Sequence, residues 1–248
     1  MTWSIVARDP ETGFFGIAVA TRLFAVGALC PWTEAKVGAI ASQALVNPSL
    51  GPHGLAFLRE GAPAPAALEI LMRGDEGRAI RQVHLIDAAG QSAAYTGAYC
   101  IDWAGQRAGE AVSVAGNMLV GPAVVKDTLA TYRANMDLPF VERLLLAMDA
   151  GEAAGGDKRG KQSAALVIQG PEPYRRLDMR ADDHGEPLVE LRRLCSDYSA
   201  TKRPRRRQAP EIRGTDPTGR SAPVTQHGTE RSTTFIPLRA DHETDGVI

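Results

Sequence analysis

A chain of 248 residues is long enough to bury a core, and its 44% hydrophobic and 23% charged residues are typical of globular proteins. With a net charge of −1, this composition excludes a fibrous or wholly disordered chain. No run of about 18 apolar residues occurs, so the sequence predicts no membrane span.

The cysteines are few, widely separated and odd in number: Cys30, Cys100 and Cys195. Such a set fits reduced thiols in a cytoplasmic protein better than a disulfide framework. Neither a CxxC nor an HExxH motif occurs and the histidines are scattered, so we expect no zinc site and no other cofactor. Nothing at the N-terminus resembles a secretory signal, which also favours the cytoplasm.

The N-terminal segment predicts a β-hairpin that begins at the second residue. A strand from Thr2, a turn at residues 9–13 and a second strand at residues 14–20 fit the apolar pattern and the turn residues between the strands. Most chains fray at their first residues, so a strand that starts here indicates a terminus held inside a sheet.

Thr2 is small enough for the initiator Met1 to be removed in front of it. The trimmed chain would carry a hydroxyl and a free α-amine on one residue. Because an α-amine has a pKa of about 7.7 to 8.0, part of it is unprotonated near neutral pH and can accept the proton of the hydroxyl. Thr2 would then be a nucleophile with its own base, although many cytosolic proteins begin with Met-Thr without any such role.

The rest of the chain groups its β-rich and helical patterns into long runs. We expect strands at residues 23–32 and 36–46, then helices at 54–61 and 65–73. The later predicted elements are strands at 82–87, 92–96 and 111–115, helices at 122–134 and 139–154, a strand at 163–169 and a helix at 187–197. His84 lies among apolar residues with no acidic or cysteine neighbour, and we interpret it as structural.

This order favours an α+β fold over a doubly wound parallel sheet, because strict alternation is absent. Two sheets packed face to face, with helices outside both, would use every predicted element. From Ala200 on, the chain is polar and Pro-rich, with nine Lys and Arg against six Asp and Glu. We therefore expect a folded domain at 1–199 and a disordered basic tail at 200–248. The basic cluster at 202–207 could contact nucleic acid, but such clusters are more often only solvated.

Several segments together resemble one family, in order along residues 2–195: TWSIVARDPETGFFGIAVATR, FAVGALCPW, GAIASQALVNPSLGPHGL, YTGAYCIDWAGQRAGE, VAGNMLVGP and GEAAGGDKRGKQSAAL. They resemble the DUF1028 proteins, an uncharacterised branch of the N-terminal nucleophile (Ntn) hydrolases. The resemblance implies a four-layer αββα sandwich, Thr2 as the nucleophile and a homo-oligomer. Arg22 and Lys36 fall at places comparable with an arginine and a lysine of proteasome-type relatives, so Lys36 is a further catalytic candidate.

Asn117 follows a predicted strand and is our candidate donor to the oxyanion, with a turn or cap as its other interpretation. The glycine-rich, charged loop at 155–163 would wrap a ligand or remain a solvated surface loop. It lacks the spacing of a P-loop, so no nucleotide is predicted. The residues expected to bind substrate are Arg22, Gln43, Asp157, Lys158 and Arg159, with the positive groups suited to a carboxylate.

The leading hypothesis is a cofactor-free hydrolase of a small amide-like bond that acts through a threonyl ester. Two alternatives stay open. One is a hydrolase that uses Cys30 or Cys100, although neither has a histidine nearby in sequence. The other is an inactive Ntn fold that serves as a binding protein, which retention of Met1 would favour.

Overall fold

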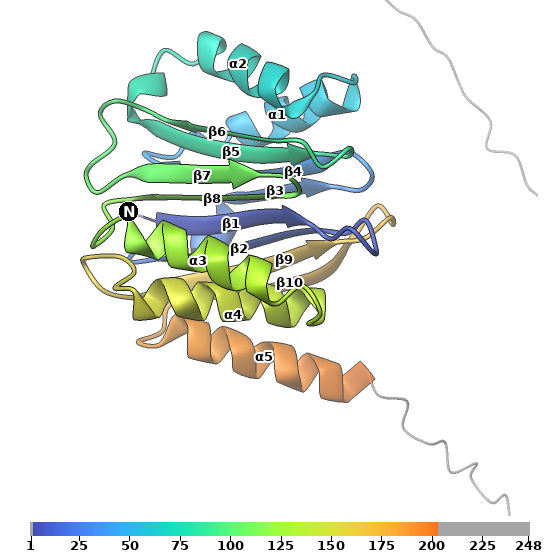
Figure 1. Cartoon of the computed structure of the whole chain (residues 1–248), viewed down its shortest axis with the longest axis vertical. Coiled ribbons are helices and arrows are strands. Elements are labelled where there is room, and N and C mark those ends of the chain that lie inside the picture. The colour runs from blue at the N-terminus through green and yellow to red at the C-terminus, as the bar shows by residue number, and fades with distance from the viewer. Residues whose placement is uncertain (1, 203–248) are drawn as a thin grey trace, which may run out of the picture. The chain divides into compact units, whose positions relative to one another are not determined.

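Six strands form the larger of two antiparallel sheets, called sheet A. The computed structural model describes residues 2–202, and in sheet A the strand order is β10-β9-β2-β1-β8-β7. The strands are Thr2–Arg8 (β1), Phe15–Thr21 (β2), Gly105–Gly109 (β7), Val112–Asn117 (β8), Ser163–Gln169 (β9) and Arg175–Ala181 (β10). The predicted hairpin of β1 and β2 is confirmed and lies in the middle of this sheet (Figure 1).

The turn between β1 and β2 is built by the side chain of Asp9. Its Oδ2 accepts hydrogen bonds from the backbone nitrogen of Thr12 at 3.2 Å and from Thr12 Oγ1 at 2.5 Å. Gly13 adopts a positive φ of 71°, which glycine accepts without strain. The sequence of this turn therefore specifies its shape locally.

Four further strands form sheet B, in the order β3-β4-β5-β6. They are Pro31–Glu34 (β3), Gly38–Ala44 (β4), Arg81–Asp87 (β5) and Ser92–Thr96 (β6). Asp87 accepts hydrogen bonds from the backbone nitrogens of Ala89 and Gln91 in the β5–β6 turn and from that of Ala64, at 2.9 Å each. One carboxylate thus ties the start of the second helix to this hairpin.

Helices cover the outer face of each sheet. Leu50–Arg59 (α1) and Ala64–Gly74 (α2) pack on sheet B, whereas Ala123–Ala134 (α3), Phe140–Ala153 (α4) and Pro187–Lys202 (α5) pack on sheet A (Figure 1). The four-layer αββα sandwich expected from the sequence is confirmed. None of the helices in residues 2–202 is both long and apolar enough to cross a membrane.

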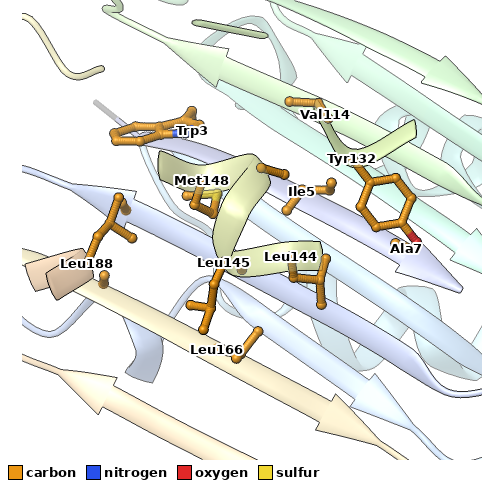
Figure 2. Close-up of a cluster of buried hydrophobic side chains, with 14 of the residues drawn as sticks. Trp3, Ile5, Ala7, Val114, Tyr132, Leu144, Leu145, Met148, Leu166 and Leu188 are labelled. Atoms are coloured by element: carbon orange, nitrogen blue, oxygen red, sulfur yellow. The ribbon is translucent and has the colours of Figure 1, made fainter. Parts of the chain in front are cut away.

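Alternation along β1 divides its side chains between two layers. Trp3 and Ile5 point toward α3 and α4, where they pack with Met148 and other buried side chains (Figure 2). Thr2 and Val6 have the opposite parity and face sheet B. The first residue of the strand is therefore directed into the space between the two sheets.

The space between the sheets is apolar at one end and polar at the other. Around Val6, Ile17 and Ile86 it is filled by hydrophobic side chains. Toward the start of β1 it holds a set of buried polar side chains that we call the polar layer: Thr2, Ser4, Thr21, Gln43, Gln82, His84, Ser113 and Asn117. A buried polar group must find a hydrogen-bond partner, so this end of the sandwich depends on side-chain hydrogen bonds.

Three predicted features differ from the structure. Residues 23–32 were expected to form one strand, but Ala25 has a φ of 52° and the 3₁₀ helix Val26–Ala28 (η1) precedes β3. Strands β7 and β10 had no sequence prediction, because both are polar edge strands. Helix α5 continues to Lys202, so residues 200–202 are helical, and the rest of the predicted tail lies outside the described residues.

Gly97 supports the loop that follows β6 by packing closely against Arg78–Ile80 (η2). A Cβ at this position would lie 2.3 Å from the carbonyl oxygen of Ala79 and 2.4 Å from that of Arg78. Because backbone atoms cannot move aside like a side chain, Gly97→Ala should lower the free energy of unfolding by about 1–3 kcal/mol. Gly121→Ala is the control, since no atom lies within 4 Å of its added Cβ. Equal urea midpoints for the two variants would contradict the prediction.

Candidate functional site

Thr2 begins β1 at the polar end of the sandwich, paired with Asn117 of β8. Thr2 is only 5% exposed to solvent, and its Oγ1 donates a hydrogen bond to Thr21 Oγ1 at 3.2 Å. Thr21 is the last residue of β2 and has the same orientation, facing sheet B. The hydroxyl of Thr2 is thus held inside the sandwich.

Two side-chain amides lie beside the carbonyl oxygen of Thr2. Gln43 Nε2 from sheet B and Asn117 Nδ2 from sheet A are each 3.4 Å from it. Both also donate to Gln82 Oε1, at 2.8 and 2.9 Å. Gln43 Nε2 also donates to the carbonyl of Ala115 at 3.1 Å, so its contact with Thr2 O is the longest of its three. Gln82 holds the two amides in place beside Thr2.

Ser4, two residues further along β1, connects Gln43 to a buried histidine. Ser4 Oγ donates to Gln43 Oε1 at 2.6 Å and lies 2.7 Å from His84 Nε2. Ser4 has one hydrogen to donate, so Nε2 of His84 must carry its own, and Nδ1 accepts from Ser113 Oγ at 3.0 Å. Burial lowers the pKa of His84 to about 3, which leaves the ring neutral at pH 7. Because Ser4 and His84 are fully buried, they are structural groups rather than a catalytic pair.

This neutral histidine should make the protein sensitive to mild acid. Between pH 6.5 and about 3 the unfolded chain binds a proton that the folded chain excludes, so stability falls as the pH falls. We expect His84 to contribute a slope of about 1.4 kcal/mol per pH unit in this range. Urea unfolding at several pH values measures it. The slope should flatten in His84→Gln and persist in His53→Gln, whose histidine is exposed; equal slopes in both would contradict the assignment.

The loop at 155–163 folds around the carboxylate of Asp157. This buried carboxylate accepts hydrogen bonds from the backbone nitrogens of Arg22 at 2.8 Å and Arg159 at 2.9 Å. The backbone of Asp157 forms an isolated β-bridge with Leu119. The loop therefore reaches from the end of β2 to the segment after β8, across the start of β1. Both oxygens of the Asp157 carboxylate accept hydrogen bonds that hold the loop in this position.

Two of the three other predicted charges, Arg22 and Lys158, are exposed and donate to carbonyl oxygens. Arg22 Nη1 donates to the carbonyl of Arg159, and Lys158 Nζ to that of Asp102, both at 2.6 Å. Arg159 also pairs with Asp157 at 3.1 Å. The structure thus brings Arg22, Lys158 and Arg159 to the same end of the sandwich as Thr2, while their role in binding stays a prediction.

Lys36 is not brought to this group. It lies in the turn between β3 and β4, with a φ of 63°, and lines a small cavity with Arg8 and Thr12. Arg8 ends β1, six residues after Thr2, and a strand rises about 3.3 Å per residue, so the two ends are about 20 Å apart. The expectation that Lys36 lies near the nucleophile is therefore wrong, because its turn is at the opposite end of the sandwich from Thr2.

The candidate cysteines are poorly placed for attack on a substrate. Cys30 is fully buried, and burial raises the pKa of its thiol to about 12. Cys100 is partly exposed, but burial also raises its pKa, and its Sγ donates to the carbonyl of Arg81 at 3.2 Å. Reactive cysteines have lowered pKa values, so these environments disfavour the cysteine hydrolase. In the described part of the chain, no group of three or more His, Cys, Asp or Glu is arranged to hold a metal ion.

A cavity of about 570 Å³ lies at the other end of the sandwich. It is lined by side chains of the β1–β2 turn, α4, β10 and α5, among them Asp9, Phe14, Phe140, Arg143 and Leu177. Asp9 directly follows the last residue of β1, so this cavity is remote from Thr2. This cavity and the candidate nucleophile therefore lie at different ends of the sandwich.

Residues 2–191 match the model of DUF1028, a family of unknown function. The chain belongs to this family. A solved DUF1028 structure, protein SPO2555 from Silicibacter pomeroyi, is 34% identical with a TM-score of 0.75, and the match covers 80% of this chain and 86% of that one. No curated protein matches.

Two solved structures of Anbu resemble this DUF1028 protein more distantly. The Gly-1 mutant from Hyphomicrobium sp. strain MC1 is 15% identical with a TM-score of 0.42, and covers 81% of this chain and 96% of its own. The ancestral beta-subunit from Yersinia bercovieri is 10% identical with a TM-score of 0.41, and covers 80% and 95%. TM-scores below 0.5 are too low to compare site residues.

Sequence analysis missed half of the polar layer. Thr21, Ser4, Gln82 and Ser113 were not candidates, and Gln43 was expected to touch substrate but is fully buried. A signal was available, because Gln82 and His84 alternate with the apolar Val83 and Leu85 in β5. That period is typical of a polar face directed at a second polar layer.

Proposed function

We propose that this DUF1028 protein is an amidohydrolase whose nucleophile is the hydroxyl of an N-terminal Thr2. The observation that carries the proposal is the position of Thr2. It is the first residue of a central strand, its hydroxyl bonds to Thr21 and its carbonyl lies beside two amides. The first residues of most chains are poorly ordered, whereas the hydroxyl and the carbonyl of Thr2 are both held by neighbouring side chains.

The proposed reaction needs Met1 to be removed. The free α-amine of Thr2 would accept the hydroxyl proton as Oγ1 attacks the carbonyl carbon of an amide. The C–N bond then breaks, the amine leaves with that proton, and the acyl group remains on Thr2 as an ester. Water attacks the ester, releases the acid and supplies a new proton to the threonine oxygen.

Asn117 remains the candidate donor to the oxyanion because its Nδ2 lies beside Thr2. In the resting arrangement the two hydrogens of this amide face Thr2 O and Gln82 Oε1. Asn117 could stabilise an oxyanion only by exchanging one of these acceptors. Gln43 would act as a positioning residue, since it is fully buried and holds Thr2 and Ser4.

The substrate is proposed to be a small amide that carries a carboxylate. Arg22 and Lys158 are exposed at the Thr2 end of the sandwich, and both donate to carbonyl oxygens. Among the described residues, no carboxylate forms an ion pair with either side chain. A guanidinium and an ammonium that keep free hydrogens can bind a carboxylate.

Mass spectrometry of the mature protein tests the proposal. The intact mass should show loss of Met1, and a β-lactone, which acylates nucleophilic hydroxyls, should add one acyl group to the peptide that begins at Thr2. Thr2→Ala should lose this adduct. Thr33→Ala is its matched control, because Thr33 bonds to Gln169 at the other end of the sandwich, and this variant should be acylated at Thr2 normally.

Two outcomes would contradict the proposal. Retention of Met1 would leave the nitrogen of Thr2 in a peptide bond, without a base, and would favour the binding-protein alternative. An adduct on Cys100 in place of Thr2 would favour the cysteine hydrolase.

A further inference from the structure

Six large apolar side chains project into solvent around the end of the sandwich that holds Thr2. We define them as the apolar rim: Leu23, Phe24, Leu45, Tyr99, Ile101 and Val120. We propose that the rim binds an apolar acyl group of the substrate, so that the protein hydrolyses an amide between an apolar acid and an amino acid. This inference rests on the proposed function and names its substrate class.

The sheet A side of the rim is continuous with the candidate nucleophile. Leu23 and Phe24 follow Arg22 directly, and Arg22 follows Thr21, whose hydroxyl accepts the hydrogen bond from Thr2. Val120 donates its backbone hydrogen bond to Gly156 in the loop that crosses the start of β1. These three residues therefore lie on short segments next to the groups that contact Thr2.

The sheet B side is fixed in the same way. Leu45 lies two residues after Gln43, and its backbone nitrogen donates to Ile80. The backbone nitrogen of Tyr99 donates to the carbonyl of Ala79. The carbonyl of Ile101 accepts from the backbone nitrogen of Met118, the residue after Asn117. Figure 1 shows the loop between β6 and β7 and the loop before β9 at the same edge as the N-terminus.

The distribution of exposed apolar side chains is uneven. The described residues include eleven large ones, and six of them, between 46% and 75% exposed, belong to the rim. The others are spread over helices and turns, such as Ile70 in α2 and Tyr174 in the β9–β10 turn. Single exposed apolar residues are normal, whereas a concentration at one site marks a binding surface.

The chemistry of the site favours an acyl group as the occupant. The acyl group stays on Thr2 from the first bond change until water releases it, so it needs binding contacts throughout. The amine product leaves after the first step, and Arg22 and Lys158 would receive its carboxylate. An apolar acid joined to an amino acid has both features.

The test compares two β-lactones that differ only in their alkyl chain, methyl or hexyl. We measure the rate of Thr2 acylation by intact mass, with Thr2→Ala as the background. A buried methylene favours binding by about 0.8 kcal/mol, roughly fourfold, and five partly buried methylenes should accelerate labelling at least about tenfold. Tyr99→Ser and Ile101→Ser should lower this preference to about threefold or less, whereas Tyr174→Ser, at the other end of the sandwich, should leave it unchanged.

Each other outcome overturns the inference in a distinguishable way. Equal labelling of Thr2 by both lactones would reject the apolar acyl group while the proposed function stands. Absence of any Thr2 adduct would reject both. Rim variants that dissociate an oligomer in light-scattering measurements, with the hexyl preference unchanged, would identify the rim as an interface between copies of this chain.

Discussion

Replacing Thr2 with alanine should lower acylation and turnover at least about 1000-fold while leaving the sandwich folded. Loss of a nucleophile removes the covalent step itself, and comparable substitutions in other enzymes cost more than this. Thr2→Ser keeps the hydroxyl and should retain a measurable part of the rate. Circular dichroism and urea unfolding of each variant check that the fold is unchanged.

The opposite result has a clear meaning. If Thr2→Ala kept more than about a tenth of the wild-type rate, another group would carry the chemistry, and the position of Thr2 would reflect packing alone. Thr21→Val separates these cases further. It removes the hydrogen-bond partner of Thr2 Oγ1 but not the nucleophile, so it should slow acylation without abolishing it.

Among replacements of a single charged side chain, replacing Arg143 should lower the free energy of unfolding most. Arg143 Nη2 donates to Asp9 Oδ1 at 2.6 Å, both side chains are at most 6% exposed, and the guanidinium lies over the rings of Tyr132 and Phe140. Arg143→Met would leave Asp9 buried without its counter-charge, which costs about 3–5 kcal/mol. Urea unfolding at pH 7 measures the loss.

Two comparisons isolate the cause. Arg73→Met breaks an exposed pair with Glu69 in α2 and should cost less than about 1 kcal/mol. The double variant Asp9→Asn with Arg143→Met removes both charges and should recover most of the loss. An Arg143→Met variant as stable as Arg73→Met would refute a buried pair.

The same pair predicts a dependence on pH. Burial alone would raise the pKa of Asp9, but hydrogen bonds from Thr12 and Arg143 outweigh it and hold the pKa below its usual value of 3.8. The stabilisation is therefore complete above pH 3.8 and is lost as the pH falls through the lower, folded-state value. Arg143→Met should reduce this loss in acid.

The elements that sequence analysis predicted well have strong local signals. The Asp9 turn, the alternating β1 and the amphipathic α2 each depend on residues close in the chain. Residues 23–32 look like a strand because they are apolar, but Gly27 packs so tightly that a Cβ would lie 2.7 Å from Ala165 Cβ. That contact joins residues far apart in sequence, and no local pattern reveals it.

The site was predictable only in part for the same reason. Thr2 was a candidate because of its position in the chain, and its catalytic role stays a prediction, whereas the resemblance to DUF1028 predicted the fold. Gln82 and Ser4 matter through hydrogen bonds that cross between sheets, so their roles depend on which strands face each other. Lys36 was misplaced because distance along the chain does not say at which end of a strand a turn lies.

Sheet A also determines the order in which the molecule can assemble. Thr2 pairs with Asn117, 115 residues later, and β2 pairs with β9, which ends at Gln169. During synthesis the first hairpin therefore leaves the ribosome with both edges open, and unpaired apolar edges can join those of neighbouring chains. Thr2 is therefore synthesised long before its partner strand β8, so co-expressed chaperones should raise the yield of native protein.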